Sequence, residues 1–226
     1  MLIHIPGVLD RDAVRQWRER LTLAPWTDGR ATAGHQSSRV KHNMQIPEDD
    51  PLAIQFGDEL ATRLGRTPEF VSAALPKRIY PPMLSRYQAS ENQHFGTHVD
   101  NAIRYDKRGT IRADLSSTLF LSDLDEYEGG ELTIEDNFGA RKLRFPAGDM
   151  VLYPSSSLHS VSPLTRGERF AAVLWTQSLI RDPIIRETLY TLDQNIRALA
   201  ADAAEDPRVL SLTNVYHNLV RHHAEP

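Results

Sequence analysis

His98 and Asp100 are the first residues of this 226-residue chain whose types and spacing suggest chemistry. They lie two residues apart, and side chains two apart in a β-strand point to the same face. In a strand, one imidazole and one carboxylate would therefore project together. An isolated His-x-Asp pair is weak evidence for a metal site, so this interpretation needs a third ligand from elsewhere in the chain.

His159 is the best third ligand, because it stands at the start of a later predicted strand that a barrel can bring beside the first. Two imidazoles and one carboxylate on one side of a metal leave about three coordination positions open, as in non-haem iron(II) oxygenases. Taken alone, His159 would more often be an ordinary surface or core histidine. The interpretation as a metal site therefore depends on the combination of His98, Asp100 and His159.

Arg169 extends the predicted site beyond a metal. If the segment that follows it is a strand, Arg169 shares one face with Val173 and Trp175. A buried guanidinium needs an anionic partner, and its planar fork suits the far carboxylate of a dicarboxylate ligand. The alternative is an ion pair with a surface acid, Asp149 or Glu168.

The elements that must position these residues change their hydrophobic period along the chain. Two amphipathic helices are predicted first, over residues 10–21 with Asp10 as N-cap and over residues 53–64. From about residue 77 to 179, short apolar and β-branched runs separated by turn residues indicate a β-sandwich or barrel. The candidate strands are 77–87, 95–98, 116–121, 131–135, 141–145, 149–153, 159–162 and 170–177.

Two further helices are expected after residue 182, beginning near Pro183 and Pro207. We expect them to run antiparallel and to pack on the barrel, extend it or mediate self-association. The predicted organisation is an oxygenase-type domain over residues 1–180 that includes the N-terminal helices, and a C-terminal helical extension over residues 181–226.

The composition narrows the possible functions. The chain has no cysteine, which excludes disulfides, thiolate metal sites and cysteine nucleophiles. With neither a secretory signal nor a membrane-spanning stretch, it is expected to be cytoplasmic. A net charge of −4 with dispersed basic residues argues against binding to nucleic acid.

Other polar residues are weaker candidates. His94 precedes His98 by four residues, a ligand spacing on a helix, but a strand or loop is expected here. The basic segment after Asp100 either lines a substrate entrance, which would favour an acidic or metal-chelating substrate, or is a solvated loop. The cations of this segment are Arg104, Lys107, Arg108 and Arg112. Near the C-terminus, no second metal site is expected at His217, His222 and His223.

Several motifs occur in the order and at the spacing of one known family. They are Arg86-Tyr87, His98-Val-Asp100, residues 127–132 (YEGGEL), residues 145–154 (FPAGDMVLYP) and residues 159–169 (HSVSPLTRGER). With these motifs the chain resembles the PKHD-type hydroxylases, bacterial relatives of the prolyl 4-hydroxylase catalytic domain among the iron/2-oxoglutarate oxygenases. The resemblance covers the predicted strands, and the flanking helical zones also look like those of the family.

The resemblance implies a fold and a set of residue roles. The fold would be α+β, a double-stranded β-helix (a jelly-roll or cupin-like barrel) with flanking N-terminal helices and a C-terminal helical extension. His98, Asp100 and His159 match the iron triad, Arg169 matches the residue that binds the distal carboxylate of 2-oxoglutarate, and Tyr87 matches a tyrosine that hydrogen-bonds this cosubstrate. The intact Asp100 favours hydroxylation over halogenation.

The implied activity is an iron(II)- and 2-oxoglutarate-dependent dioxygenase that releases succinate and CO2, with L-ascorbate as the reductant that rescues oxidised iron. The alternative is a non-catalytic, cupin-like protein that binds or senses iron, although such a protein needs no dicarboxylate anchor at Arg169. The substrate would be a small molecule or a peptide, and the resemblance suggests a siderophore or another molecule of iron uptake. Neither nucleic acid nor a membrane is an expected partner.

Overall fold

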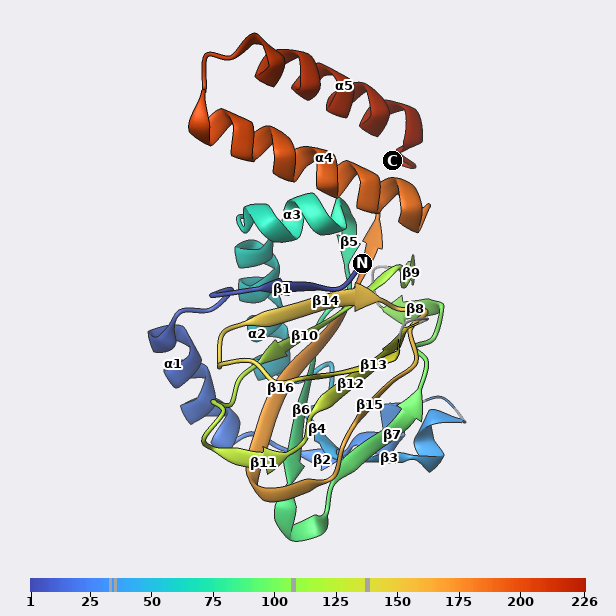
Figure 1. The fold of residues 1–226 in the computed structure, drawn as a ribbon. Helices are drawn as coiled ribbons and strands as arrows, with labels where there is room; N and C mark the ends of the chain where they lie inside the picture. The colour runs from blue at the N-terminus through green and yellow to red at the C-terminus, as the bar shows by residue number, and fades with distance from the viewer. Residues whose placement is uncertain (33, 35, 107–108, 137–138) are drawn as a thin grey trace.

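The computed structural model describes residues 1–32, 34, 36–106, 109–136 and 139–226. Within these residues the strands form an antiparallel nine-stranded sheet, a five-stranded sheet that faces it and a two-stranded hairpin (Figure 1). Helices lie outside the paired sheets and at one end of the molecule. This is the predicted α+β architecture, a double-stranded β-helix with flanking helices.

The larger sheet contains nine strands, seven of which form one continuous order. Its order is β1 (Ile3–Ile5), β14 (Met150–Pro154), β10 (Leu115–Phe120), β16 (Leu164–Ser178), β6 (Met83–Gln88), β4 (Met44–Gln45) and β2 (Thr27–Asp28), and β5 (Pro76–Ile79) and β11 (Tyr127–Gly129) also pair with β16. The smaller sheet has the order β13 (Gly139–Leu143), β12 (Leu132–Asp136), β15 (His159–Val161), β7 (His94–His98) and β3 (Lys41–His42). The hairpin consists of β8 (Ile103–Asp106) and β9 (Gly109–Arg112).

Five α-helices complete the described structure. They are α1 (Arg11–Thr22), α2 (Pro51–Leu64), α3 (Pro68–Ala74), α4 (Pro183–Asp202) and α5 (Pro207–His223), with short 3-10 turns at Gly29–Thr32, Ser37–Arg39 and Ala89–Glu91. Asp10 accepts a hydrogen bond of 2.8 Å from the Ala13 amide and caps α1, as predicted. No helix among the described residues has the length and apolar character that crossing a bilayer requires.

The larger sheet is covered on both faces, and all six residues of β10 are buried although three of them are polar. On β10, Leu115 and Leu119 pack in the core cluster that contains Phe56 and Leu60 of α2. The alternate side chain Phe120 points the other way, into a cluster shared with the smaller sheet. The space between the two sheets is therefore walled by side chains of both.

The two C-terminal helices run antiparallel and lie beyond α3, at the end of the molecule away from α1 (Figure 1). Leu189 of α4 packs with Leu75 and Ile180, and Ser72 of α3 donates a hydrogen bond of 2.6 Å to Asp193. The predicted antiparallel helix pair is confirmed, and α4 packs on the end of the barrel. The division of the chain at residue 180 stays a prediction.

The structure corrects one predicted segment and establishes the conformation of another. Residues 77–87 form two strands, β5 and β6, because Pro81 and Pro82 lack the amide protons that a continuous ladder requires. The basic segment after Asp100 is a β-hairpin rather than a loop. The sequence Asn137-Phe138-Gly139 is turn-like, but residues 137 and 138 lie outside the described residues.

Candidate metal centre and its pocket

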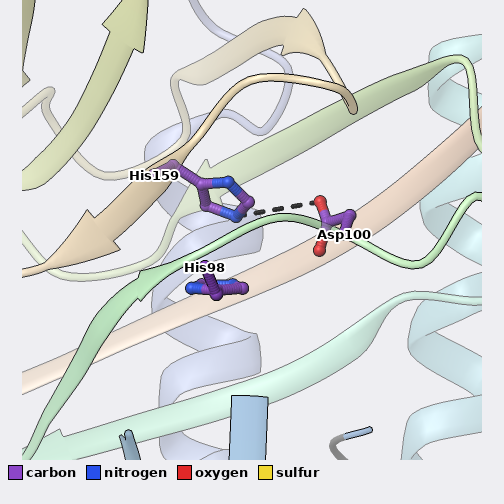
Figure 2. A group of neighbouring side chains, drawn as sticks. All are labelled: His98, Asp100 and His159. Atoms are coloured by element: carbon purple, nitrogen blue, oxygen red, sulfur yellow. Dashed lines mark ion pairs between the residues drawn. The ribbon is translucent and has the colours of Figure 1, made fainter. Parts of the chain in front are cut away.

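The two histidines of the predicted triad are brought together by strand pairing. β7 and β15 are neighbours in the smaller sheet, and His98 lies directly opposite His159. Asp100 follows β7 two residues later, so its side chain returns to the same face. One ligand atom from each residue lies within 4.8 Å of the others, and the three side chains converge between the sheets (Figure 2).

Each histidine is oriented by a hydrogen bond to the backbone. The Nδ1 atom of His98 lies 2.9 Å from the Gly96 carbonyl, and that of His159 lies 3.0 Å from the Ser157 carbonyl. Because a carbonyl oxygen only accepts, each Nδ1 carries the proton and donates it. In the neutral ring, Nε2 then presents its lone pair, which is the arrangement of metal-binding histidines.

The surroundings of His98 favour its neutral form. Burial, followed by the neighbouring His159, lowers the pKa of His98 to about 4. Phe95 stacks on the ring, with the two ring centroids 3.6 Å apart and an interplanar angle of 14°. At neutral pH the Nε2 atom of His98 therefore carries no proton that a metal must displace.

Asp100 is held by the opposite sheet. Ser116 of β10 donates a hydrogen bond of 2.6 Å from Oγ to Asp100 Oδ2, and the Ser155 hydroxyl lies 2.8 Å from Ser116 Oγ. The carboxylate side chain is 8% exposed, and its Oδ2 lies 3.7 Å from His159 Nε2 (Figure 2). A buried carboxylate beside two neutral imidazoles is a donor set that suits a divalent metal and leaves the remaining positions open.

Arg169 lines the same pocket, and its side chain lacks the surface partner that the alternative interpretation required. It is 2% exposed, and its Nε and Nη2 atoms have no hydrogen-bond partner among the described residues. Asp149 pairs with His4, and Glu168 accepts from Gln88. Two buried guanidinium donors without an acceptor are what an anchor for a carboxylate would leave before its ligand binds.

Tyr87 lies beside Arg169, whose guanidinium carbon is 5.4 Å from the centroid of the tyrosine ring. The two residues are directly opposite on β6 and β16. Burial raises the pKa of the Tyr87 hydroxyl, so it remains protonated and able to donate a hydrogen bond. Tyr87 lines the same pocket, and its hydrogen bond to the cosubstrate stays a prediction.

Polar residues of the N-terminal zone form a wall that the sequence analysis missed. Lys41, Asn43 and Gln45 are each buried and line the pocket. They alternate with exposed or half-buried neighbours, which is a strand pattern with polar side chains inward. That period of two was the available signal, but the segment is too short and too polar to stand out from a loop.

The other basic residues and histidines suggested by the sequence differ in whether they lie at the site. Arg104 lines the pocket, whereas Arg112 pairs with Asp114 and Glu225 away from it. Lys107 and Arg108 lie outside the described residues. Among the described residues, His98, Asp100 and His159 are the only group of three or more that could hold a metal, so neither His94 nor the C-terminal histidines belong to one.

A comparison with known proteins decides the family. A PKHD-type hydroxylase of Pseudomonas putida strain KT2440 is 51% identical over 227 residues, which cover 100% of both chains. This chain belongs to the PKHD-type hydroxylase family. The family models of the PKHD-type hydroxylase C-terminal domain and of the 2OG-Fe(II) oxygenase superfamily match residues 185–225 and 82–177. The resemblance found in the sequence is thus confirmed, and with it the class of 2-oxoglutarate-dependent oxygenases.

Solved structures share the fold of this PKHD-type chain. A Pseudomonas putida prolyl-4-hydroxylase covers 78% of this chain and 92% of its own, with a TM-score of 0.51 and 18% identity. HygX from Streptomyces hygroscopicus, solved with nickel and 2-oxoglutarate bound, covers 79% of this chain and 84% of its own, with a TM-score of 0.54 and 16% identity. At these identities the likeness concerns the fold, which confirms the double-stranded β-helix.

Proposed function

We propose that this PKHD-type protein hydroxylates its substrate with oxygen and 2-oxoglutarate, and that His98, Asp100 and His159 hold the iron(II). The observation that carries the proposal is the convergence of two backbone-oriented imidazoles and one buried carboxylate within 4.8 Å. All three ligands come from the smaller sheet and its continuation, so the side toward the larger sheet stays open for cosubstrate and oxygen.

Arg169 and Tyr87 would bind 2-oxoglutarate. The unpaired donors of the buried Arg169 suit the distal carboxylate, and the protonated Tyr87 hydroxyl can donate a further hydrogen bond. When bound, the iron centre couples decarboxylation of 2-oxoglutarate to succinate and CO2 with oxidation of a substrate C–H bond. Phe120, Leu132 and Val161 supply apolar walls that exclude water from this space.

The test compares two ligand variants with a matched control. His98→Ala and Asp100→Ala should lose iron(II) binding in titration calorimetry and lose succinate release with cell extract as the substrate source. His94→Ala is the control, because His94 lies on the same strand but outside the triad. Unchanged binding in both ligand variants would overturn the proposal.

The same experiment separates the proposed enzyme from the non-catalytic alternative. An iron-binding or iron-sensing protein would bind iron(II) through the same residues but would release no succinate with any extract. It would also show no dependence of 2-oxoglutarate binding on Arg169. Oxygen-dependent succinate release that requires His98 would exclude this alternative.

The reductant and the substrate class are proposed from the family resemblance. L-ascorbate is the proposed reductant, and a siderophore or another molecule of iron uptake is the proposed substrate, with a peptide as the other choice. A cytoplasmic location and self-association through α4 and α5 are proposed from the sequence. The division into residues 1–180 and 181–226 is supported by the separate C-terminal family match at residues 185–225.

A further inference from the structure

The β8–β9 hairpin places a cation over the outer part of the pocket. Arg104 of β8 stacks on Trp175, with its guanidinium carbon 3.5 Å from the ring centroid. Ile111, which pairs with Arg104 across the hairpin, is buried in one cluster with Trp175 and Met83. The guanidinium is therefore held in place, and its side chain is 13% exposed.

The donors around this cation lack acceptors. Arg104 Nη2 approaches Met83 Sδ at 3.3 Å, a weak acceptor, and Arg104 Nε has no partner among the described residues. Trp175 Nε1 is likewise buried and unpaired there. Glu48 comes no nearer to Arg104 than 4.0 Å and accepts from the Tyr80 hydroxyl. Arg and Trp side chains only donate, so an occupant of this part of the pocket must supply acceptor oxygens.

Lys41 adds a second cation on the same pocket lining. It is 5% exposed, its Nζ donates a hydrogen bond of 2.9 Å to Thr32, and no described carboxylate lies within ion-pair distance. Burial, followed by repulsion from Arg104, lowers the pKa of Lys41 to about 8. Two like charges that line one buried pocket oppose each other unless an anion lies near both.

The charges of the proposed iron(II) and 2-oxoglutarate would not neutralise the positive charges of Arg104 and Lys41. Asp100 is the one acid among the described residues that line the pocket. Iron(II) and doubly charged 2-oxoglutarate cancel each other, and Asp100 offsets Arg169. Arg104 and Lys41 then have no counter-charge within the described pocket lining, and Glu48, which lies outside that lining, is 4.0 Å from Arg104.

We infer that the substrate carries an anionic oxygen group, such as a carboxylate, that binds Arg104 on the Trp175 side of the pocket while facing Lys41. This inference rests on the proposed function for the statement that the occupant is the substrate. The guanidinium fork binds the two oxygens side by side, and Met83 and Val173 contact an adjoining apolar part. That apolar part bears the C–H bond presented to the metal.

The test uses Trp175 itself as the reporter, because it lies against Arg104. Tryptophan fluorescence is titrated in the full-length protein loaded with nickel(II) and 2-oxoglutarate, and the Trp175→Phe variant gives the background from the other tryptophans. The probes are two pairs of similar shape, each consisting of an acid and its neutral amide. One is 3-phenylpropionate with its amide, and the other is N-acetyl-Gly-Asp-Gly-amide with its Asn counterpart. The first pair represents a free acid and the second an acidic peptide side chain.

In the wild type, at least one acidic probe should bind about tenfold or more tightly than its neutral partner. Arg104→Gln should abolish this preference, and Arg104→Lys should retain part of it. Arg112→Gln is the matched control from the same hairpin, because Arg112 lies outside the pocket and should leave the preference unchanged. The pair that responds tells whether the anion belongs to a small acid or to a peptide.

The inference is overturned if neither acidic probe is preferred by the wild type, or if the preference survives Arg104→Gln. Nickel and 2-oxoglutarate binding are measured separately on every variant. If the wild type binds neither nickel(II) nor 2-oxoglutarate, the proposed function fails. The dependence of probe binding on Arg104 still decides the inference about the anionic group.

Discussion

Ser116 in the larger sheet donates a hydrogen bond of 2.6 Å to Asp100, which follows a strand of the smaller sheet. The bond joins the two sheets at the proposed metal centre and orients the carboxylate, whose Oδ2 atom also lies 3.7 Å from His159 Nε2. Ser155 lies 2.8 Å from the Ser116 hydroxyl and extends the network. The position of Asp100 thus depends on a residue that does not itself reach the metal.

Ser116→Ala should lower iron(II) affinity by about 10- to 100-fold, the usual effect of losing a residue that orients a metal ligand. Ser117→Ala is the matched control, because Ser117 is the next residue of β10, is equally buried and has an unpaired hydroxyl. Titration calorimetry with iron(II) under argon measures both. Equal affinities for the two variants would show that the Ser116 hydrogen bond does not position Asp100.

Arg169→Gln should weaken 2-oxoglutarate binding by about 100-fold, because a hydrogen-bonded charge pair is lost. Iron(II) affinity should stay unchanged, since Arg169 is not in the triad. The control is Arg166→Gln, which removes an exposed guanidinium that pairs with Glu128 at the surface. A variant that binds 2-oxoglutarate as the wild type does would remove Arg169 from the proposed cosubstrate site.

His98 should make the metal-free protein sensitive to acid. Its pKa is about 4 in the folded state and near 6.5 when unfolded, so the unfolded chain binds more protons between these values. The free energy of unfolding contributed by His98 is complete above pH 6.5 and declines as the pH falls toward 4. Urea unfolding in the presence of EDTA should show a smaller decline for His98→Gln, whereas His217→Gln in the C-terminal helix should match the wild type.

Gly130→Ala should impair 2-oxoglutarate binding through Arg169. Gly130 has a φ of +63°, and an added Cβ would lie 2.6 Å from Leu164 Cδ1 and 3.1 Å from Arg169 Cδ. We expect a loss in affinity on the order of tenfold, because the anchor is displaced. Gly139→Ala is the control for backbone strain, since its φ is +122° and its Cβ would meet nothing within 4 Å. If both variants bind 2-oxoglutarate equally well, Gly130 does not position Arg169.

The sequence predicted several strands of the barrel, because their apolar and β-branched residues occur in short runs between turn residues. Residues 116–121 and 149–153 were placed within one residue of β10 and β14 at each end. Strand β16 begins at Leu164, before the predicted start at residue 170, and it includes Gly167 at φ +74°. His98 and Asp100 could be predicted to share one face because they lie two residues apart, whereas this spacing did not place His159 beside them.

The wall formed by Lys41, Asn43 and Gln45 could not be predicted with the same ease. Strands β3 and β4 have two residues each, which is too short for an alternating pattern to be recognised. The hydrogen bond from Ser116 to Asp100 depends on how two sheets meet, and no local pattern encodes that distance. The β8–β9 hairpin could not be recognised in the sequence, because its charged residues resemble those of a solvated loop.

The strand pairing also affects when the metal ligands come together during synthesis. Ile3 lies opposite Leu152, and His98 lies opposite His159. Because such pairs join residues far apart in the chain, large loops must close before the pairs contribute any stabilisation. Domains dominated by these pairings fold in roughly milliseconds to seconds. A nascent chain therefore cannot hold the complete ligand set until β15 has left the ribosome and paired with β7.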